Sequence, residues 1–278
     1  MLTIDVLLGA LDLEPTGSGS TYRAGNTASG HGTIFGGQLL AQTVVAARRA
    51  HEGKAVKTVQ TIFARAGRLD APVEITTEPI HDGRAFSSTT VTIRQGDRLC
   101  ARSLVLLTVD EPDFVRHADP APATAAHPPT GEGQVPHGEG GDWRIESVDG
   151  VDVSDPDLVG PPEHEVWTRF AGAPDDPVTD QALLAYATDA FLIGAAMRPH
   201  AGVGQSQAHV TLQTGVVSHT LTYHEPSRAA DWLLLSQRST YAGRGRAHGR
   251  GEVFRSDGQM VASYVQDAVL RRMEGNHG

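Results

Sequence analysis

Residues 38–50 have the sequence QLLAQTVVAARRA and directly follow Phe35-Gly36-Gly37. Their apolar side chains recur at the spacing of one helix face, which predicts an amphipathic helix. Residues 178–197, VTDQALLAYATDAFLIGAAM, show the same spacing and predict a second, more apolar helix. These two helices organise the remaining chain, because a similar set of strand-like segments follows each of them.

Four strand-like segments follow each predicted helix. After the first helix they are residues 56–66, 73–80, 85–95 and 99–109; after the second they are 213–224, 232–240, 245–254 and 260–270. Turn signals at Gly96-Asp97 and Asp257-Gly258 join the last two segments of each set. Gly83-Arg84 and Gly243-Arg244 occupy matching places, 160 residues apart. The pattern predicts an α+β fold of two tandem repeats, each wrapping an antiparallel sheet around one long helix.

A segment of different composition separates the repeats. Residues 117–142 contain five Pro, five Gly and no Lys or Arg, which predicts a mobile, unstructured linker. We therefore divide the chain into an N-terminal repeat at 1–116, a linker at 117–142 and a C-terminal repeat at 143–278. Residues 1–14 carry no basic side chain and predict a short amphipathic helix, not a signal peptide.

Composition disfavours several classes of function. With 33 acidic and 23 basic residues, the net charge of −10 does not suit a general nucleic-acid binder. The single cysteine, Cys100, excludes an internal disulfide and a Cys-rich zinc site, and the 13 histidines are scattered, so we expect no metal and no cofactor. No run of about 18 apolar residues predicts a membrane span. G-x-S-x-G, Walker A and G-x-G-x-x-G motifs are absent from the sequence, and we expect a cytoplasmic protein.

Two polar residues stand out in apolar surroundings. Asp189 lies within the second predicted helix, and Gln266 lies in the last strand-like segment, VASYVQDAV. A buried carboxylate needs a hydrogen-bond partner or it takes up a proton, and a nearby amide would satisfy both groups. Aligning the repeats pairs Asp189 with Val45 and Gln266 with Leu106. One repeat is therefore expected to keep a polar site while the other uses the same positions as core.

The order of short motifs resembles the type II acyl-CoA thioesterase family, whose fold is a double hot-dog. The resemblance covers nearly the whole chain outside the linker. Its carriers are Phe35-Gly36-Gly37-Gln38, Phe63-x-Arg65-x-Gly67, Asp82-Gly83-Arg84-x-Phe86-Ser87, Tyr186-Ala187-x-Asp189, His219-x-x-x-x-His224-x-Pro226, Trp232-Leu233-Leu234, and Val261-Ala262-Ser263 leading to Gln266.

The resemblance implies hydrolysis of acyl-CoA thioesters to a free acid and CoA, without metal or cofactor, by a homo-oligomer. The family holds the attacking water with an Asp, a Ser or Thr, and a Gln, which correspond here to Asp189, Val216 and Gln266. Valine cannot hydrogen-bond, so the chain departs from the family at the hydroxyl position. We expect Ser218, two residues on and on the same strand face, or Thr214 to supply the hydroxyl.

Substrate contacts are expected at two places. Gly36 and Gly37 would let the amino end of the first helix approach the thioester oxygen, and close packing is an equal alternative for this pair. The basic side chains of Arg84, Arg244 and Arg246 are candidates for the CoA phosphates.

The sequence is compatible with two other functions. A double hot-dog protein that binds acyl-CoA or acyl chains without turnover is favoured by Val216, whereas Asp189 and Gln266 favour hydrolysis. A hydratase or dehydratase of the same fold is less favoured. That chemistry pairs an Asp with a nearby His, and no His follows Asp189 in its predicted helix.

Overall fold

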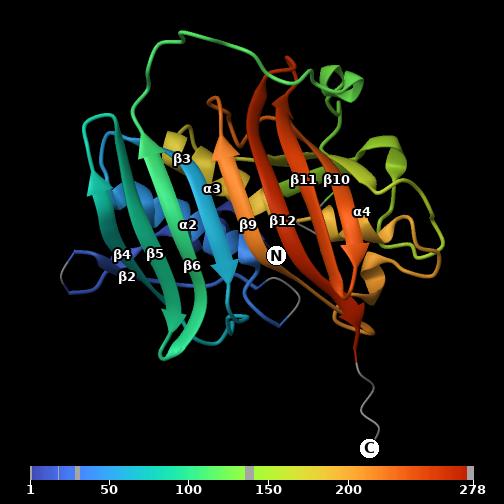
Figure 1. Ribbon diagram of the computed structural model, residues 1–278, viewed down its shortest axis with the longest axis horizontal. Coiled ribbons are helices and arrows are strands. Elements are labelled where there is room, and N and C mark those ends of the chain that lie inside the picture. The colour runs from blue at the N-terminus through green and yellow to red at the C-terminus, as the bar shows by residue number, and fades with distance from the viewer. Residues whose placement is uncertain (1, 18, 29–31, 135–140, 274–278) are drawn as a thin grey trace, which may run out of the picture.

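The computed structural model describes residues 2–17, 19–28, 32–134 and 141–273. They form one sheet of twelve strands, in the order β1-β2-β4-β5-β6-β3-β9-β12-β11-β10-β8-β7, and every neighbouring pair is antiparallel. The long helices pack behind this sheet in the view of Figure 1. None of the helices in the described residues is long and apolar enough to cross a membrane.

Each half of the chain supplies half of this sheet. The N-terminal half contains α1 (Ile4–Leu11), β1 (Glu14–Pro15), β2 (Thr21–Ala24), α2 (Gly36–Ala50), β3 (Ala55–Phe63), β4 (Val73–Asp82), β5 (Phe86–Gln95) and β6 (Arg98–Thr108). The C-terminal half contains β7 (Trp143–Ser147), β8 (Glu163–Phe170), α3 (Pro177–Thr188), α4 (Leu192–Met197), β9 (Leu212–Tyr223), β10 (Leu233–Gly243), β11 (Arg246–Arg255) and β12 (Met260–Arg272). Short 3₁₀ turns occur at Ala123–Ala126, Val148–Gly150 and Gln205–Gln207. The eight predicted strands are confirmed as β3–β6 and β9–β12, and the two repeats are confirmed as helix-wrapped antiparallel sheets.

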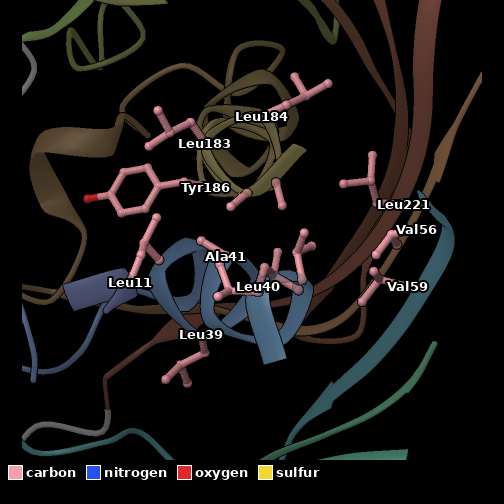
Figure 2. Packing of buried hydrophobic residues seen from close by; sticks show 14 of the residues in the cluster. Leu11, Leu39, Leu40, Ala41, Val56, Val59, Leu183, Leu184, Tyr186 and Leu221 are labelled. Atoms are coloured by element: carbon pink, nitrogen blue, oxygen red, sulfur yellow. The ribbon is translucent and has the colours of Figure 1, made fainter. Parts of the chain in front are cut away.

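The two halves meet at the centre of the sheet and between the helices. Strands β3 and β9 pair directly, with Val59 opposite Leu221, so the sheet is continuous across the duplication. Helices α2 and α3 pack against each other on the inner face, and Figure 2 shows Ala41 on the side of α2 that is turned toward α3. Apolar side chains of both helices and both central strands form one buried cluster.

Bulges establish how the repeats correspond. In β3 and β9 the extra residues are Lys57 and Val217, and in β4 and β10 they are Ile80 and Thr240, each pair 160 residues apart. In β6 and β12 they are Cys100 and Val261, 161 apart. Because bulges fix strand register, equivalent irregularities mark equivalent positions.

This correspondence corrects one predicted pairing. With an offset of 161 in the last strand, the equivalent of Gln266 is Val105 and not Leu106. Val105 is 1% exposed, whereas Leu106 points outward and is 36% exposed. A shift of one residue reverses the face of a strand, which is why an alignment on small residues alone missed it. Since Val105 is apolar like Leu106, the N-terminal repeat still has an apolar residue at the position equivalent to Gln266.

The single helix predicted over residues 178–197 is wrong. Helix α3 ends at Thr188, and α4 begins at Leu192 after a turn in which Phe191 has a φ of 71°. A left-handed conformation is unfavourable for a bulky residue and interrupts the α-helical hydrogen-bond ladder. Two strands in the same half, β7 and β8, were also missed, and β8 extends the sheet beyond β10.

The prediction of a mobile linker is wrong for its first part. Ala125, in the 3₁₀ turn Ala123–Ala126, is 1% exposed and packs with Trp167, Leu234 and Phe254 on the outer face of the C-terminal half. Thr124 Oγ1 also donates a hydrogen bond of 2.7 Å to Glu165 Oε2. Short apolar residues between the prolines therefore dock on the sheet. Residues 135–140 of the linker lie outside the described residues.

Candidate active site

Asp189 stands at the break between α3 and α4. It caps the carboxyl end of α3 and is 7% exposed. The left-handed turn that follows is held by packing, because the Phe191 ring lies 6.0 Å from that of Trp143 and 6.1 Å from that of His164. A strained conformation persists only where its surroundings support it, and such positions concentrate at functional sites. The break leaves the Asp189 side chain facing the beginning of α2.

Two glycines allow this approach. A Cβ atom at Gly36 would lie 2.6 Å from Oδ2 of Asp189, and one at Gly37 would lie 2.3 Å from the carbonyl oxygen of Tyr186. The N–H of Gly37 donates a hydrogen bond to the Asp189 carboxylate. Phe35, the N-cap of α2, offers no side-chain cap, so the carboxylate takes that place beside the positive end of the helix. Gly36 therefore packs closely on Asp189 and Gly37 on α3, which fits the close-packing alternative, and a role of this helix end toward the thioester oxygen stays a prediction.

The pKa of the Asp189 carboxyl group lies near neutral pH. Burial raises its pKa to about 7, against the smaller opposite effect of the hydrogen bond from Gly37. Its Oδ1 atom is buried and has no hydrogen-bond partner among the described residues. A carboxylate that titrates near neutral pH and keeps one oxygen free is suited to take a proton from a bound water.

Gln266 joins the same site through α3. Its Nε2 donates to the carbonyl oxygen of Thr188, the residue before Asp189, at 3.1 Å, and lies 2.9 Å from Nδ1 of His219. Its Oε1 is buried without a partner in the part of the chain described. The structure thus brings Asp189 and Gln266 together across one peptide unit, each with one unpaired oxygen.

The expected strand face of Ser218 is wrong. The bulge at Val217 shifts the register, so that Val216 lies opposite buried Ala268 while Ser218 lies opposite exposed Asp267. Ser218 Oγ donates a 2.9 Å hydrogen bond to Asp267 Oδ2 on the outer face of the sheet. Val216 is on the face that carries Gln266, and Ser218 is on the other. The structure does not bring Ser218 to the site, whereas Thr214, the other expected hydroxyl, lies opposite Leu270 on the face that carries Gln266.

The three arginines proposed for CoA do not gather in one place. Arg84 lies in the exposed turn between β4 and β5, and Arg244 and Arg246 lie at the equivalent turn between β10 and β11. These turns close hairpins at opposite ends of the sheet in Figure 1. In the described residues, no group of three or more His, Cys, Asp or Glu side chains could hold a metal ion.

Sequence reasoning missed two members of the site, Thr188 and His219. His219 is completely buried on the inner face, next to Gln266, and Thr188 is completely buried beside Asp189. The signal was available, because His219 alternates with Leu221 and Tyr223 in β9 and so had to share their buried face.

Both halves of the chain match models of known protein domains. Residues 112–270 match the acyl-CoA thioesterase C-terminal domain, and residues 24–108 match the acyl-CoA thioesterase N-terminal domain. The chain belongs to the type II acyl-CoA thioesterase family. Acyl-CoA thioesterase 2 of Haemophilus influenzae is 24% identical over 91% of this chain and 93% of its own length. Acyl-coenzyme A thioesterase 8 of Mus musculus is 25% identical over 86% of this chain and 80% of its own length.

Solved structures confirm the double hot-dog fold of this thioesterase family member. Acyl-CoA thioesterase II TesB2 from Mycobacterium marinum superposes with a TM-score of 0.78 at 26% identity, covering 98% of this chain and 99% of that one. The tesB protein of Mycobacterium avium subs paratuberculosis gives a TM-score of 0.78 at 23% identity, covering 96% and 99%. A hot-dog-fold protein from Alicyclobacillus acidocaldarius gives 0.75 at 18% identity, covering 96% and 98%.

Proposed function

We propose that the chain hydrolyses acyl-CoA thioesters to a free acid and CoA, with the carboxylate of Asp189 as general base. The observation that supports this most is the buried Asp189 carboxyl group, with a pKa of about 7 and an Oδ1 without a partner among the described residues, next in sequence to Thr188, whose carbonyl oxygen accepts from Gln266. Two acceptor oxygens can hold both hydrogens of one water molecule, and this leaves a lone pair of that water free to attack.

In the proposed reaction, Asp189 accepts a proton while the water oxygen bonds to the carbonyl carbon of the thioester. The tetrahedral intermediate then loses the CoA sulfur as leaving group, and the sulfur takes the proton back from Asp189. The products are a free carboxylic acid and CoA thiol. The positive end of α2 lies beside Asp189 and would favour the negative charge that develops on the carbonyl oxygen.

Binding of acyl-CoA without turnover remains the second candidate. Val216 supports it, because the position where the family has a hydroxyl group carries an apolar side chain, and Ser218 faces away. A water held by two groups is less constrained than one held by three. The experiment must therefore distinguish slow hydrolysis of acyl-CoA from binding of acyl-CoA without hydrolysis.

The decisive experiment measures thiol release from acyl-CoA substrates of increasing chain length. We expect turnover by the wild-type chain, and a loss of about 100-fold or more in kcat for Asp189→Asn, since removal of a general base typically costs that much. KM should change less than about threefold. The control is Asp267→Asn, which changes an exposed acid on the outer face. Equal rates for wild type and Asp189→Asn would refute the mechanism. Tight binding by the wild type without hydrolysis would favour the binding function.

Three further assignments stay predictions of the same function. Arg84, Arg244 and Arg246 are proposed contacts of the CoA phosphates. Because Arg84 lies at the other end of the sheet, one CoA can meet either Arg84 or the pair Arg244 and Arg246, and only substitutions by Ala at the end that it meets should raise KM more than they lower kcat. The boundaries 1–116, 117–142 and 143–278 are the proposed domain division. A homo-oligomer in the cytoplasm is the expected state, and light scattering during size-exclusion chromatography tests the oligomer.

A further inference from the structure

We propose that His219 is a positioning residue that fixes the side-chain amide of Gln266, so that its Oε1 atom faces the attacking water. The catalytic purpose of this arrangement rests on the proposed function. The orientation itself rests on the hydrogen bonds of three buried side chains, Gln266, His219 and Thr188, which we call the amide clamp.

The hydrogen bond to Thr188 determines which end of the Gln266 side-chain amide is the NH₂ group. The carbonyl oxygen of Thr188 can only accept a hydrogen bond, so the Gln266 atom 3.1 Å away must be the NH₂ nitrogen. The same nitrogen lies 2.9 Å from Nδ1 of His219. Since an amide NH₂ group only donates, Nδ1 must accept and carry no proton.

The tautomer of His219 then determines the rest of the clamp. With Nδ1 bare, the ring proton is on Nε2, which lies 3.2 Å from Thr188 Oγ1 and donates to it. The Thr188 hydroxyl in turn donates to the carbonyl oxygen of Ala185 at 3.0 Å. Each N–H or O–H group in this series of hydrogen bonds has one acceptor, and the series ends on the backbone of α3. Among the described residues, Gln266 Oε1 is the one buried polar side-chain atom of the clamp without a partner.

The surroundings keep His219 in this state. The ring is 0% exposed and stacks on Tyr264 with 5.5 Å between centroids and 18° between planes. Burial lowers the pKa of His219 to about 3, so the ring is neutral and Nδ1 stays available as an acceptor. Packing and hydrogen bonds to protein groups therefore fix the three side chains and leave Gln266 Oε1 as the position for a water.

The N-terminal repeat argues that the clamp is not needed for folding. At the offsets given by the bulges, the equivalents of His219 and Gln266 are Val59 and Val105. Both valines are 1% exposed and pack in the core. The same fold thus accommodates two apolar side chains where the C-terminal repeat has a hydrogen-bonded polar pair. A polar pair retained only beside Asp189 points to a role in the site.

The test compares two substitutions of similar size, His219→Asn and His219→Leu. The Asn side-chain oxygen can accept from Gln266 near the former Nδ1 position, whereas Leu has no acceptor. We expect kcat to fall about 10-fold or more in His219→Leu and less than about threefold in His219→Asn, with KM unchanged in both. The Tm should fall by similar amounts, because both variants lose the same ring stacking. Equal loss of kcat in both variants, or no loss in either, would overturn the positioning role.

A second measurement does not depend on turnover. Nitrogen-15 NMR should find His219 protonated on Nε2 and bare on Nδ1, and the NH₂ protons of Gln266 protected from exchange in wild type and in His219→Asn but not in His219→Leu. A proton on Nδ1 overturns the proposal. If no acyl-CoA is hydrolysed by the wild type, the proposed function fails, and the NMR result still decides how the amide is oriented.

Discussion

The substitution Gly36→Ala should displace the Asp189 carboxylate directly. The new Cβ would lie 2.6 Å from Asp189 Oδ2 and 3.2 Å from its Cγ. Carbon and oxygen atoms approach comfortably to about 3.3 Å, so the carboxylate must retreat by about 0.7 Å. It would then lose alignment with the N–H of Gly37. A displacement of about 1 Å at a reacting group costs about 100-fold, so we expect kcat to fall about 30- to 100-fold.

The fold should tolerate this change. Gly36 is not in the left-handed region, and Ala favours a helix over Gly by about 1 kcal/mol, which offsets the contact with a side chain that can move. The measurement pairs kcat from thiol release with Tm from circular dichroism. Gly37→Ala is the control, because its Cβ would meet the backbone oxygen of Tyr186 at 2.3 Å and should lower Tm strongly. Wild-type kcat and wild-type Tm in Gly36→Ala would refute the contact between α2 and Asp189.

Four other outcomes follow from the structure. Because only the ionised form of Asp189 can accept a proton and its pKa is about 7, kcat/KM should rise about tenfold per pH unit below pH 7 and level off above it. Because the pKa of Asp189 is raised in the folded state, ionisation of this group opposes folding, and the free energy of unfolding should fall between about pH 4 and pH 7. Denaturant unfolding of Asp189→Asn should lack that decrease, and the variant should be more stable than the wild type at pH 8. Ser218→Ala should leave kcat within about twofold, since its hydroxyl bonds Asp267 on the outer face; a large loss would place a water path on that face. Ala125→Asp should lower Tm by about 5–10 °C without changing kcat at 25 °C, because it buries a charge against Trp167, and an unchanged Tm would mean that the linker does not dock there.

Much of the fold could be predicted from local patterns. The strands β3–β6 and β9–β12 alternate strongly and end at glycine-containing turns, and α2 has clear helical spacing. The break at Phe191 could not be predicted, because residues 178–197 are helix-forming throughout and the turn is stabilised by aromatic contacts with β7 and β8. Tertiary packing there overrides local propensity.

The site was predictable in its residue types and not in its geometry. Asp189 and Gln266 were conspicuous as polar residues in apolar segments, and both are buried together. Ser218 was placed on the wrong face because a bulge adds one residue to β9, and no feature of the local sequence marks Val217 as that residue. His219 was overlooked because it was treated as part of a motif and its burial was not considered.

The pairing of β3 with β9 has a consequence for how the protein is made. Val59 and Leu221 are neighbours in the sheet, yet about 160 residues separate them along the chain. During synthesis the first half emerges with β3 as an unpaired edge strand, and that edge stays uncovered until β9 (Leu212–Tyr223) has been made. Unpaired edges recruit strands from other molecules, and contacts this distant in sequence form slowly. Either half produced alone would expose an unpaired edge strand, so we expect a fragment cut at the linker to aggregate. Co-expressed halves should instead associate with each other by pairing β3 with β9.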